Sequence, residues 1–297
     1  ASMDAGGNSA PVLDYAIGKE NLELAKKAID KGANPSDPMP KVVATNNDQA
    51  LQMLLSKGAD PNAGMGTAVS QNNLTMLRKL LIADADPNPH LQPAAVAGSN
   101  EIVKALVTAG ADPNLGAMDA VKAEKYQTAI ILVEAGASPD PILPIAVEKR
   151  EMGLLQATIA AGGNPSLGMQ TAIDNNDNQV ARVLLNAGAD ATPSQYIEAA
   201  CGRNNQDLVR LLLQNNADPN NGMHISVNSG NTTMVEQLLS AGANGRSDSY
   251  MSSAAEQQNG SMINLLLNAG GNPRCCHAGH YQTRQYAYCH YAHSERS

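Results

Sequence analysis

The sequence contains no phenylalanine and no tryptophan, and only 3% of its residues are aromatic. Because 43% of the residues are nevertheless hydrophobic, alanine, leucine, valine, isoleucine and methionine must fill the core. Side chains of this kind suit closely stacked helices, since bulky rings would hold the layers apart. The composition therefore favours packed helices over a core built on aromatic residues.

Other absences exclude several classes of protein. Only Cys201 precedes the last 25 residues, so disulfides do not hold the body of the chain together. No apolar run approaches the roughly 18 residues that span a bilayer, and the first ten residues lack the basic and apolar segments of a signal peptide. A net charge of −8 without a stripe of Lys and Arg argues against nucleic-acid binding. These features predict a cytoplasmic protein, with the nucleus as the alternative.

A phrase of the form LLxxGADPN recurs along the chain at a nearly constant interval. Seven of its nine intervals are 26 residues, and the other two are 28. A period between about 20 and 50 residues is typical of a repeat protein, in which each unit buries its apolar face only against its neighbours. The glycine of the phrase, or the residue in its place, is Gly32, Gly58, Asp84, Gly110, Gly136, Gly162, Gly188, Asn216, Gly242 or Gly270.

Residues 61–86 show what one unit contains. Its apolar positions are Met65, Ala68 and Val69, followed by Met76, Leu77, Leu80 and Leu81. Both groups have the i, i+3, i+4 spacing of an amphipathic helix. Asn72 and Asn73 lie between them, and asparagine tolerates the left-handed backbone that ends a helix. We therefore expect a short helix, a tight turn, a longer helix and a loop in every unit.

The same positions are refilled along the chain. The Met65 position is occupied in the other units by Leu13, Met39, Leu91, Ala117, Leu143, Met169, Tyr196, Met223 and Met251, and the Ala68 position by Ala16, Val42, Ala94, Ala120, Ala146, Ala172, Ala199, Ser226 and Ala254. A residue that is almost always small indicates close contact between two helices. The sequence predicts an all-α fold, an α-solenoid of about ten helix–turn–helix units with short loops over residues 9–272.

These residues resemble the ankyrin repeat, whose units read roughly G-x-T-P-L-H-x-A-A-x-x-G-H-x-E-V-V-x-L-L-L-x-x-G-A-D-V-N-A. The segments VKALVTAGADPN (103–114) and LVRLLLQNNADPN (208–220) are similar to the second helix and loop of that pattern, and YIEAAC (196–201) is similar to its first helix. The resemblance implies a stack of helix pairs that binds other proteins.

The units depart from the ankyrin pattern in length. An ankyrin unit has about 33 residues, and the missing seven fall between the Asp of G-A-D and the start of the first helix. In the family this segment forms a projecting β-turn, which usually contacts partners together with the first helices. We therefore expect helix pairs without the β-turn finger, and binding on a helix face, on a row of loops or at an end of the stack.

No catalytic motif is found in the sequence: H-E-x-x-H, G-x-S-x-G and the Walker A pattern are all missing. The predicted function is a non-enzymatic scaffold or adaptor that binds another protein without a cofactor. The alternative is a structural protein that self-associates into filaments, because contacts that do not close on themselves build open assemblies. A third hypothesis is a zinc-binding module at the C-terminus.

One cluster of exposed residues is the candidate partner site. In the outward-facing slots of the first helix, after the Ala-Val pair, most units carry Asn, Gln, Ser or Thr, whereas two neighbouring units carry charged residues and a tyrosine. Tyr and Arg are enriched at binding hot spots, although ion pairs on a solvated helix face would explain the same charges. The candidate residues are Lys122, Glu124, Lys125, Tyr126, Lys149 and Arg150.

The two ends of the chain differ from the repeats. Residues 1–8 are expected to be disordered, with Ala1 and Ser2 a cloning remnant. Residues 273–297 are rich in Cys, His and Tyr, and the pattern C-H-x-x-H occurs there twice. Its i, i+4 pairs supply a Cys2His2 set suited to tetrahedral zinc, namely Cys276, His280, Cys289 and His293. The alternatives for this segment are an apolar cap on the last repeat, which four tyrosines could provide, and a disordered or artificial extension.

Overall fold

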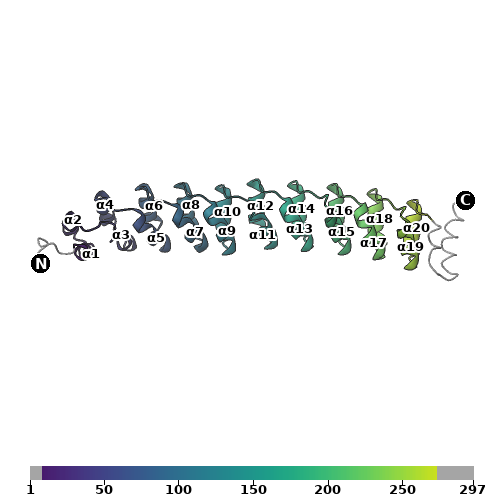
Figure 1. The fold of residues 1–297 in the computed structure, drawn as a ribbon, viewed down its shortest axis with the longest axis horizontal. Helices are drawn as coiled ribbons and strands as arrows, with labels where there is room; N and C mark the ends of the chain where they lie inside the picture. Colours follow the sequence, from purple (N-terminus) through teal and green to yellow (C-terminus); the bar gives the residue numbers. More distant parts are fainter. Residues whose placement is uncertain (1–8, 273–297) are drawn as a thin grey trace. The chain divides into compact units, whose positions relative to one another are not determined.

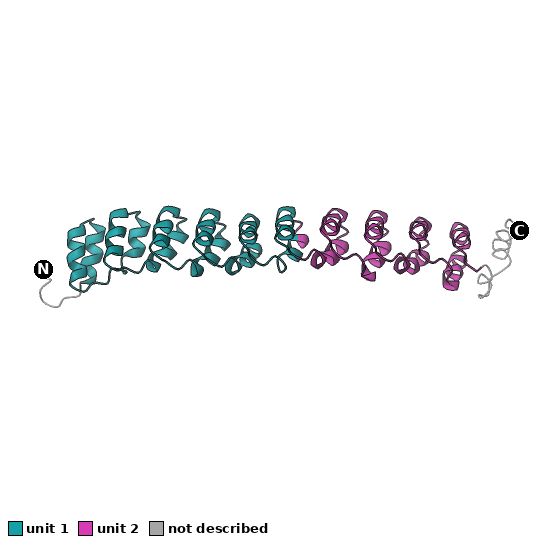
Figure 2. Cartoon of the chain, turned by 90° about the horizontal axis from the view of Figure 1, so that it is seen from above, with its two compact units in different colours: residues 1–146, 151–163 teal, residues 147–150, 164–297 magenta. Residues whose placement is uncertain are grey.

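The computed structural model describes residues 9–272, which form twenty α-helices and no strand (Figure 1). First and second helices of each repeat alternate along the chain, so the predicted α-solenoid of ten helix pairs is confirmed for these residues. The described part divides into two compact units, residues 9–146 with 151–163 and residues 147–150 with 164–272 (Figure 2).

The first unit contains the repeats that precede residue 164. Its helices are α1 (Ala10–Gly18), α2 (Leu22–Asp30), α3 (Met39–Ala44), α4 (Asp48–Ser56), α5 (Asn62–Ser70), α6 (Leu74–Ile82), α7 (Asn88–Ala97), α8 (Asn100–Thr108), α9 (Asn114–Lys122), α10 (Tyr126–Glu134), α11 (Leu143–Glu148) and α12 (Met152–Ala160). The last two residues of α11 belong to the second unit.

The second unit contains the remaining four helix pairs. Its helices are α13 (Ser166–Asp174), α14 (Asn178–Asn186), α15 (Ser194–Gly202), α16 (Gln206–Gln214), α17 (Asn220–Asn228), α18 (Thr232–Ser240), α19 (Asp248–Glu256) and α20 (Gly260–Asn268). In both units the core consists of the predicted Leu, Met, Ala, Val and Ile positions; Met65 and Leu80, for example, are fully buried.

Each repeat reverses direction through two left-handed residues. Asn72 ends the first helix of the third repeat with φ 52°, and Gly58 has φ 84° after the second helix of the repeat before it. Asparagine and glycine are the residues that adopt this backbone at least cost, which explains why they recur at these places. The loops that follow are short, as in residues 57–61. No strand occurs anywhere in residues 9–272, which agrees with the predicted loss of the β-turn finger.

The G-A-D-P-N loop joins successive repeats by hydrogen bonds. The carboxylate of Asp60 accepts a bond from the backbone N–H of Asn62 at 2.9 Å. The side-chain oxygen of Asn62 then accepts a bond from the backbone N–H of Asp86, one repeat later, at 2.7 Å. Asn88 and Asp112 repeat this contact at 2.9 Å. The regular acidic residues of the loops therefore have a structural role.

One detail of the predicted repeat alignment is wrong. In α15 the fully buried residues are Ile197 and Ala200, and they take the places that the sequence assigned to Tyr196 and Ala199. The loop before this helix, residues 187–193, is longer than most. The sequence alignment therefore assigned the buried positions of α15 one residue too early. Because a helix rotates by about 100° per residue, a shift of one residue moves a side chain away from its slot.

One position of the first helix alternates between glycine and a large residue. A Cβ added to Gly64 of α5 would lie 2.9 Å from Val43 Cγ2 of α3, and one added to Gly116 of α9 would lie 2.9 Å from Ala95 Cβ of α7. The glycines are Gly64, Gly116, Gly168 and Gly222, and the repeat that follows each of them carries His90, Ile142, Tyr196 or Tyr250. Helix pairs α3–α5, α7–α9 and α15–α17 pack more closely than α5–α7, α13–α15 and α17–α19. The packing therefore repeats every two helix pairs.

Two glycines of α5 test this close packing. Gly66 has open space around its Cβ direction, whereas Gly64 meets a β-branched side chain that has little rotamer freedom. Both changes to alanine gain about 0.5–1 kcal/mol of helix propensity. Overpacking at Gly64 should cost about 1–3 kcal/mol. In urea unfolding followed by circular dichroism, Gly66→Ala should unfold at higher urea than Gly64→Ala, and equal midpoints would contradict the proposed contact.

Candidate functional site

The turn between the two helices of a repeat has a regular hydrogen-bond pattern. In the third repeat Asn73 caps α6, because its side-chain oxygen accepts a bond from the Met76 N–H at 3.1 Å. Its amide nitrogen donates to the side-chain oxygen of Asn46, the left-handed residue of the preceding repeat, at 2.8 Å. One asparagine thus caps a helix and joins two repeats. Asparagine makes the same cap at Asn21, Asn47, Asn205, Asn231 and Asn259.

This pattern, which we call the turn ladder, is interrupted in repeats four to six. The N-cap residues of α8, α10 and α12 make no side-chain cap bond, and they are Ser99, Lys125 and Glu151. The left-handed residues before them are Gly98, Glu124 and Arg150, with φ of 72°, 57° and 57°. A long charged side chain at a left-handed position lacks the local amide contact that stabilises asparagine there. The turns of repeats five and six are therefore stabilised less by local hydrogen bonds than most other turns.

The predicted partner residues lie in this interrupted region. Lys122 is the last residue of α9, Glu124 and Lys125 form the turn, and Tyr126 begins α10. The three charged residues are exposed and the tyrosine is half-buried. They belong to the first unit. The sequence assigned them to an outward helix face, but the first helix ends at Lys122, so most of the cluster occupies the turn.

Lys149 and Arg150 follow α11 and belong to the second unit. Arg150 forms an ion pair with the carboxylate of Asp177 at 2.7 Å, and the side chain of Asp177 is only 6% exposed. Asp177 is itself the N-cap of α14 and accepts a bond from the Val180 N–H at 3.1 Å. Arg150 thus replaces an asparagine of the turn ladder with an ion pair. A structural role accounts for this residue, whereas Lys149 is exposed and lies 3.9 Å from Glu148.

The ladder step between repeats five and six differs from the others. Glu151 follows Glu124 by the same 27 positions that separate Asn73 from Asn46, so two glutamates occupy places that elsewhere share a hydrogen bond. Two ionised carboxylates have no proton to share, so this step cannot form the hydrogen bond that joins Asn46 and Asn73. Within the described residues neither glutamate forms an ion pair. Glu151 was not among the predicted site residues, although its place in the repeat could have identified it.

Lys125 has a packing contact in the same turn. A Cβ added to Gly98 would lie 3.0 Å from the Lys125 Cδ, so the stem of the lysine covers this glycine. Lys122 approaches Asp119 only to 3.9 Å. The turn of the fifth repeat therefore presents the carboxylate of Glu124, the ammonium groups of Lys122 and Lys125 and part of Tyr126 to solvent, and the turn of the sixth repeat adds the half-exposed Glu151. Such a surface can exchange ion pairs with a charged partner, and it contains no nucleophile aligned with a base.

The predicted zinc ligands Cys276, His280, Cys289 and His293 lie outside the described residues, so the zinc hypothesis stays a prediction. In the part of the chain that the structure describes, no group of three or more Cys, His, Asp or Glu side chains is arranged to hold a metal ion. Of the helices in that part, none is both long and apolar enough to cross a membrane.

Comparison with known proteins identifies the repeats. Residues 196–275 match the family model for ankyrin repeats in three copies. Among solved structures, the chain is similar to the crystal structure of the human ASB11 ankyrin repeat domain, with 19% identity and a TM-score of 0.33 over 77% of this chain and 96% of that one. A circular tandem repeat protein with a novel repeat topology matches with 12% identity and a TM-score of 0.13 over 88% of this chain and 61% of that one. No match was found among curated proteins.

The family assignment rests on the sequence match, because both TM-scores are below 0.5. The matched region contains the last three helix pairs of the structure, α15 to α20. The preceding helix pairs carry the same buried positions and the same left-handed residues. Residues 196–275 therefore match ankyrin repeats, and the earlier helix pairs share their buried positions and their left-handed residues.

Proposed function

We propose that this chain is a non-enzymatic scaffold that binds a protein partner through the turn of its fifth repeat. Ankyrin repeats in general mediate protein–protein interaction, which supports the class of function. The observation that carries the site is the pair of glutamates, Glu124 and Glu151, at a ladder step that elsewhere holds two hydrogen-bonded asparagines. Sites where local folding rules are broken are often functional, because selection for binding offsets the lost stability.

The chemistry of the turn favours a basic segment of the partner. A Lys or Arg side chain of the partner would form charge-assisted hydrogen bonds with Glu124 and Glu151, neither of which has an ion pair among the described residues. The half-buried Tyr126 begins the next helix of the same turn and adds aromatic surface. The net charge of −8 would speed the approach of a basic partner. Packed helices hold these side chains in place, which lowers the entropic cost of binding.

Arg150 is not one of the proposed binding residues, because it already has a structural role. Its ion pair with Asp177 supports the cap of α14, so a charge reversal there would place two acids together at a mostly buried position and unfold the turn. Loss of binding in such a variant would report damage to the fold. The informative variants therefore change Glu124 and Glu151 together, and Lys149 by itself.

Restoring the asparagines should stabilise the protein. In the double variant Glu124→Asn with Glu151→Asn, the new residues can cap α12 and rebuild the ladder bond, which should raise the free energy of unfolding by roughly 1–2 kcal/mol. The matched control is Asn46→Glu with Asn73→Glu, which should lower it by a similar amount. Urea unfolding measures both. A double Asn variant that is less stable than the wild type would show that the glutamates support the fold.

The same double variant should lose its partner although it is more stable. Affinity capture on the full chain, with quantitative mass spectrometry, should show a protein retained by the wild type and reduced about tenfold on the double Asn variant, as expected for loss of a charge pair worth about 1.4 kcal/mol. Lys149→Glu should reduce it less. Charge reversals at Lys27 and Arg182, exposed on second helices elsewhere, serve as controls. Identical sets of captured proteins on the wild type and the double variant would exclude this turn as the binding site.

A further inference from the structure

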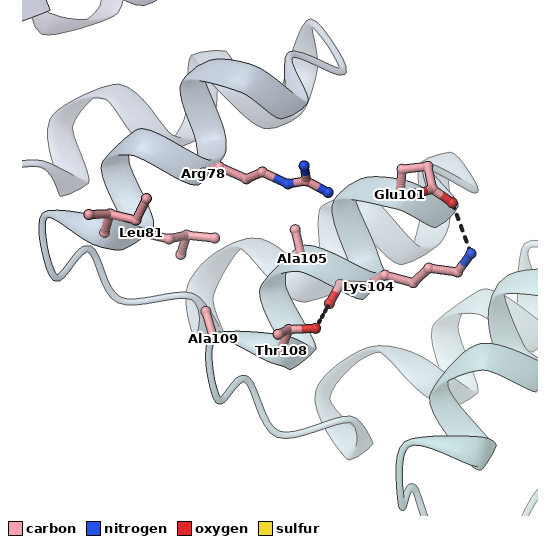
Figure 3. Close-up of a pocket in the computed structure, with 8 residues that line it drawn as sticks. Arg78, Leu81, Glu101, Lys104, Ala105, Thr108 and Ala109 are labelled. Carbon is pink, nitrogen blue, oxygen red and sulfur yellow. Dashed lines mark hydrogen bonds and ion pairs between the residues drawn. The ribbon is translucent and has the colours of Figure 1, made fainter.

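A groove lies on the solvent side of two second helices in the first unit, α6 and α8. It has a volume of about 550 Å³. Its apolar lining comes from Leu81, Ile82, Ala105 and Ala109, and its polar rim from Arg78, Glu101, Lys104 and Thr108 (Figure 3). This surface is formed by second helices, so it is separate from the turn of the fifth repeat.

Ile82 makes this groove unlike the surfaces of the other repeats. Its side chain is 83% exposed, which leaves a large apolar residue in water. The last position of the other second helices is polar or small in every repeat, with Asp30, Ser56, Thr108, Glu134, Ala160, Asn186, Gln214, Ser240 and Asn268. Packing inside the protein therefore does not explain Ile82.

The two basic side chains beside the groove, Lys104 and Arg78, differ in whether they form an ion pair. Lys104 forms an ion pair with Glu101 at 2.8 Å and is the main cause of the lowered pKa of that carboxyl, to which the charge of Arg78 adds. Arg78 itself forms no ion pair or hydrogen bond with any described residue. Figure 3 shows its guanidinium group extending into the space between the two helices. Arg78 precedes Ile82 by four residues, so both lie on one face of α6 about one helical turn apart. The groove thus offers an unpaired cation at one end and an apolar surface at the other.

A second surface of the chain carries similar charges but different residues at the positions that line the groove. Between α14 and α16, Arg182 takes the place of Arg78, and Arg210 pairs with Asp207 at 3.2 Å as Lys104 pairs with Glu101. There, however, Asn186 replaces Ile82 and Leu211, which is only 5% exposed, replaces Ala105. The charges alone are therefore common to both surfaces, whereas the exposed isoleucine and the space above Ala105 are particular to α6 and α8.

We infer that the groove between α6 and α8 binds an acidic, amphipathic segment of a partner protein. A carboxylate of the segment would pair with Arg78, whose planar guanidinium suits a bidentate contact. An apolar side chain about one helical turn away would cover Leu81 and Ile82 and enter the space above Ala105. A short helix with Glu and Leu three or four residues apart has this spacing.

The probe is a fluorescein-labelled peptide of three Glu-Ala-Ala-Leu copies, with a twin in which every Glu is Gln, each titrated into the full chain by fluorescence anisotropy. The Glu peptide should bind about tenfold or more tightly than its twin. Arg78→Gln, Ile82→Asn and Ala105→Leu should each weaken it about tenfold, and the last two introduce residues that the α14–α16 surface already tolerates. Arg182→Gln, the matched control, should leave the affinity unchanged.

Several results would overturn the inference. Equal affinities for the two peptides would show that Arg78 does not bind a carboxylate. An equal loss of affinity in Arg78→Gln and Arg182→Gln would show that the peptide is attracted by charge without a specific site. Sedimentation of the chain alone provides a second readout. If the wild type self-associates and Ile82→Asn makes it monomeric, the groove is occupied by a second copy and not by an acidic partner segment. None of these variants alters the turn of the fifth repeat, so the two binding proposals fail or succeed separately.

Discussion

Each helix pair of this protein can bury its apolar side only against the pairs before and after it, and every other feature depends on this contact. A pair of nine-residue helices has no interior of its own, and isolated helices of that length are marginal in water. Full burial of Met65 or Leu80 requires neighbours in register. The constant step between repeats is therefore a physical requirement, because a shift of one residue would turn the buried face toward solvent.

Two sets of hydrogen bonds preserve that register at opposite ends of the helices. At one end, the Asn62 side chain binds the backbone of the next loop. At the other, Asn73 caps its own helix and holds the preceding turn. Both use short amide side chains that satisfy backbone groups left open at helix ends. A repeat that replaces these asparagines is held to its neighbours mainly by apolar contact, and it can use the freed position for another purpose.

The packing of the first helices adds a second period of two repeats. Glycine at one repeat allows close approach to the preceding helix, and the large residue of the next repeat widens the following step. Half-buried His90 is one of these large residues, and its burial lowers its pKa from the ordinary value. In the second helices, the size of one side chain varies between repeats. Ala105 of α8 is small and lines a groove, whereas the larger Leu211 occupies the equivalent position of α16. Surfaces for partners thus arise where side-chain size departs from the average repeat.

The amino-acid pattern alone was enough to predict the fold class, the number of repeats, the position of almost every buried residue and the loss of the β-turn finger. Those features depend on local spacing and on residues such as Gly58 and Asn72, whose backbone preference is visible without any tertiary contact. It also located the unusual turns at repeats five and six. It could not separate Arg150, which supports Asp177, from Glu124 and Glu151, which have no such partner. This difference between paired and unpaired charges became visible in the folded chain, because the ladder joins residues 27 positions apart in the sequence. Stacking of the repeats brings those side chains together and so shows which charges are paired and which remain open to a partner.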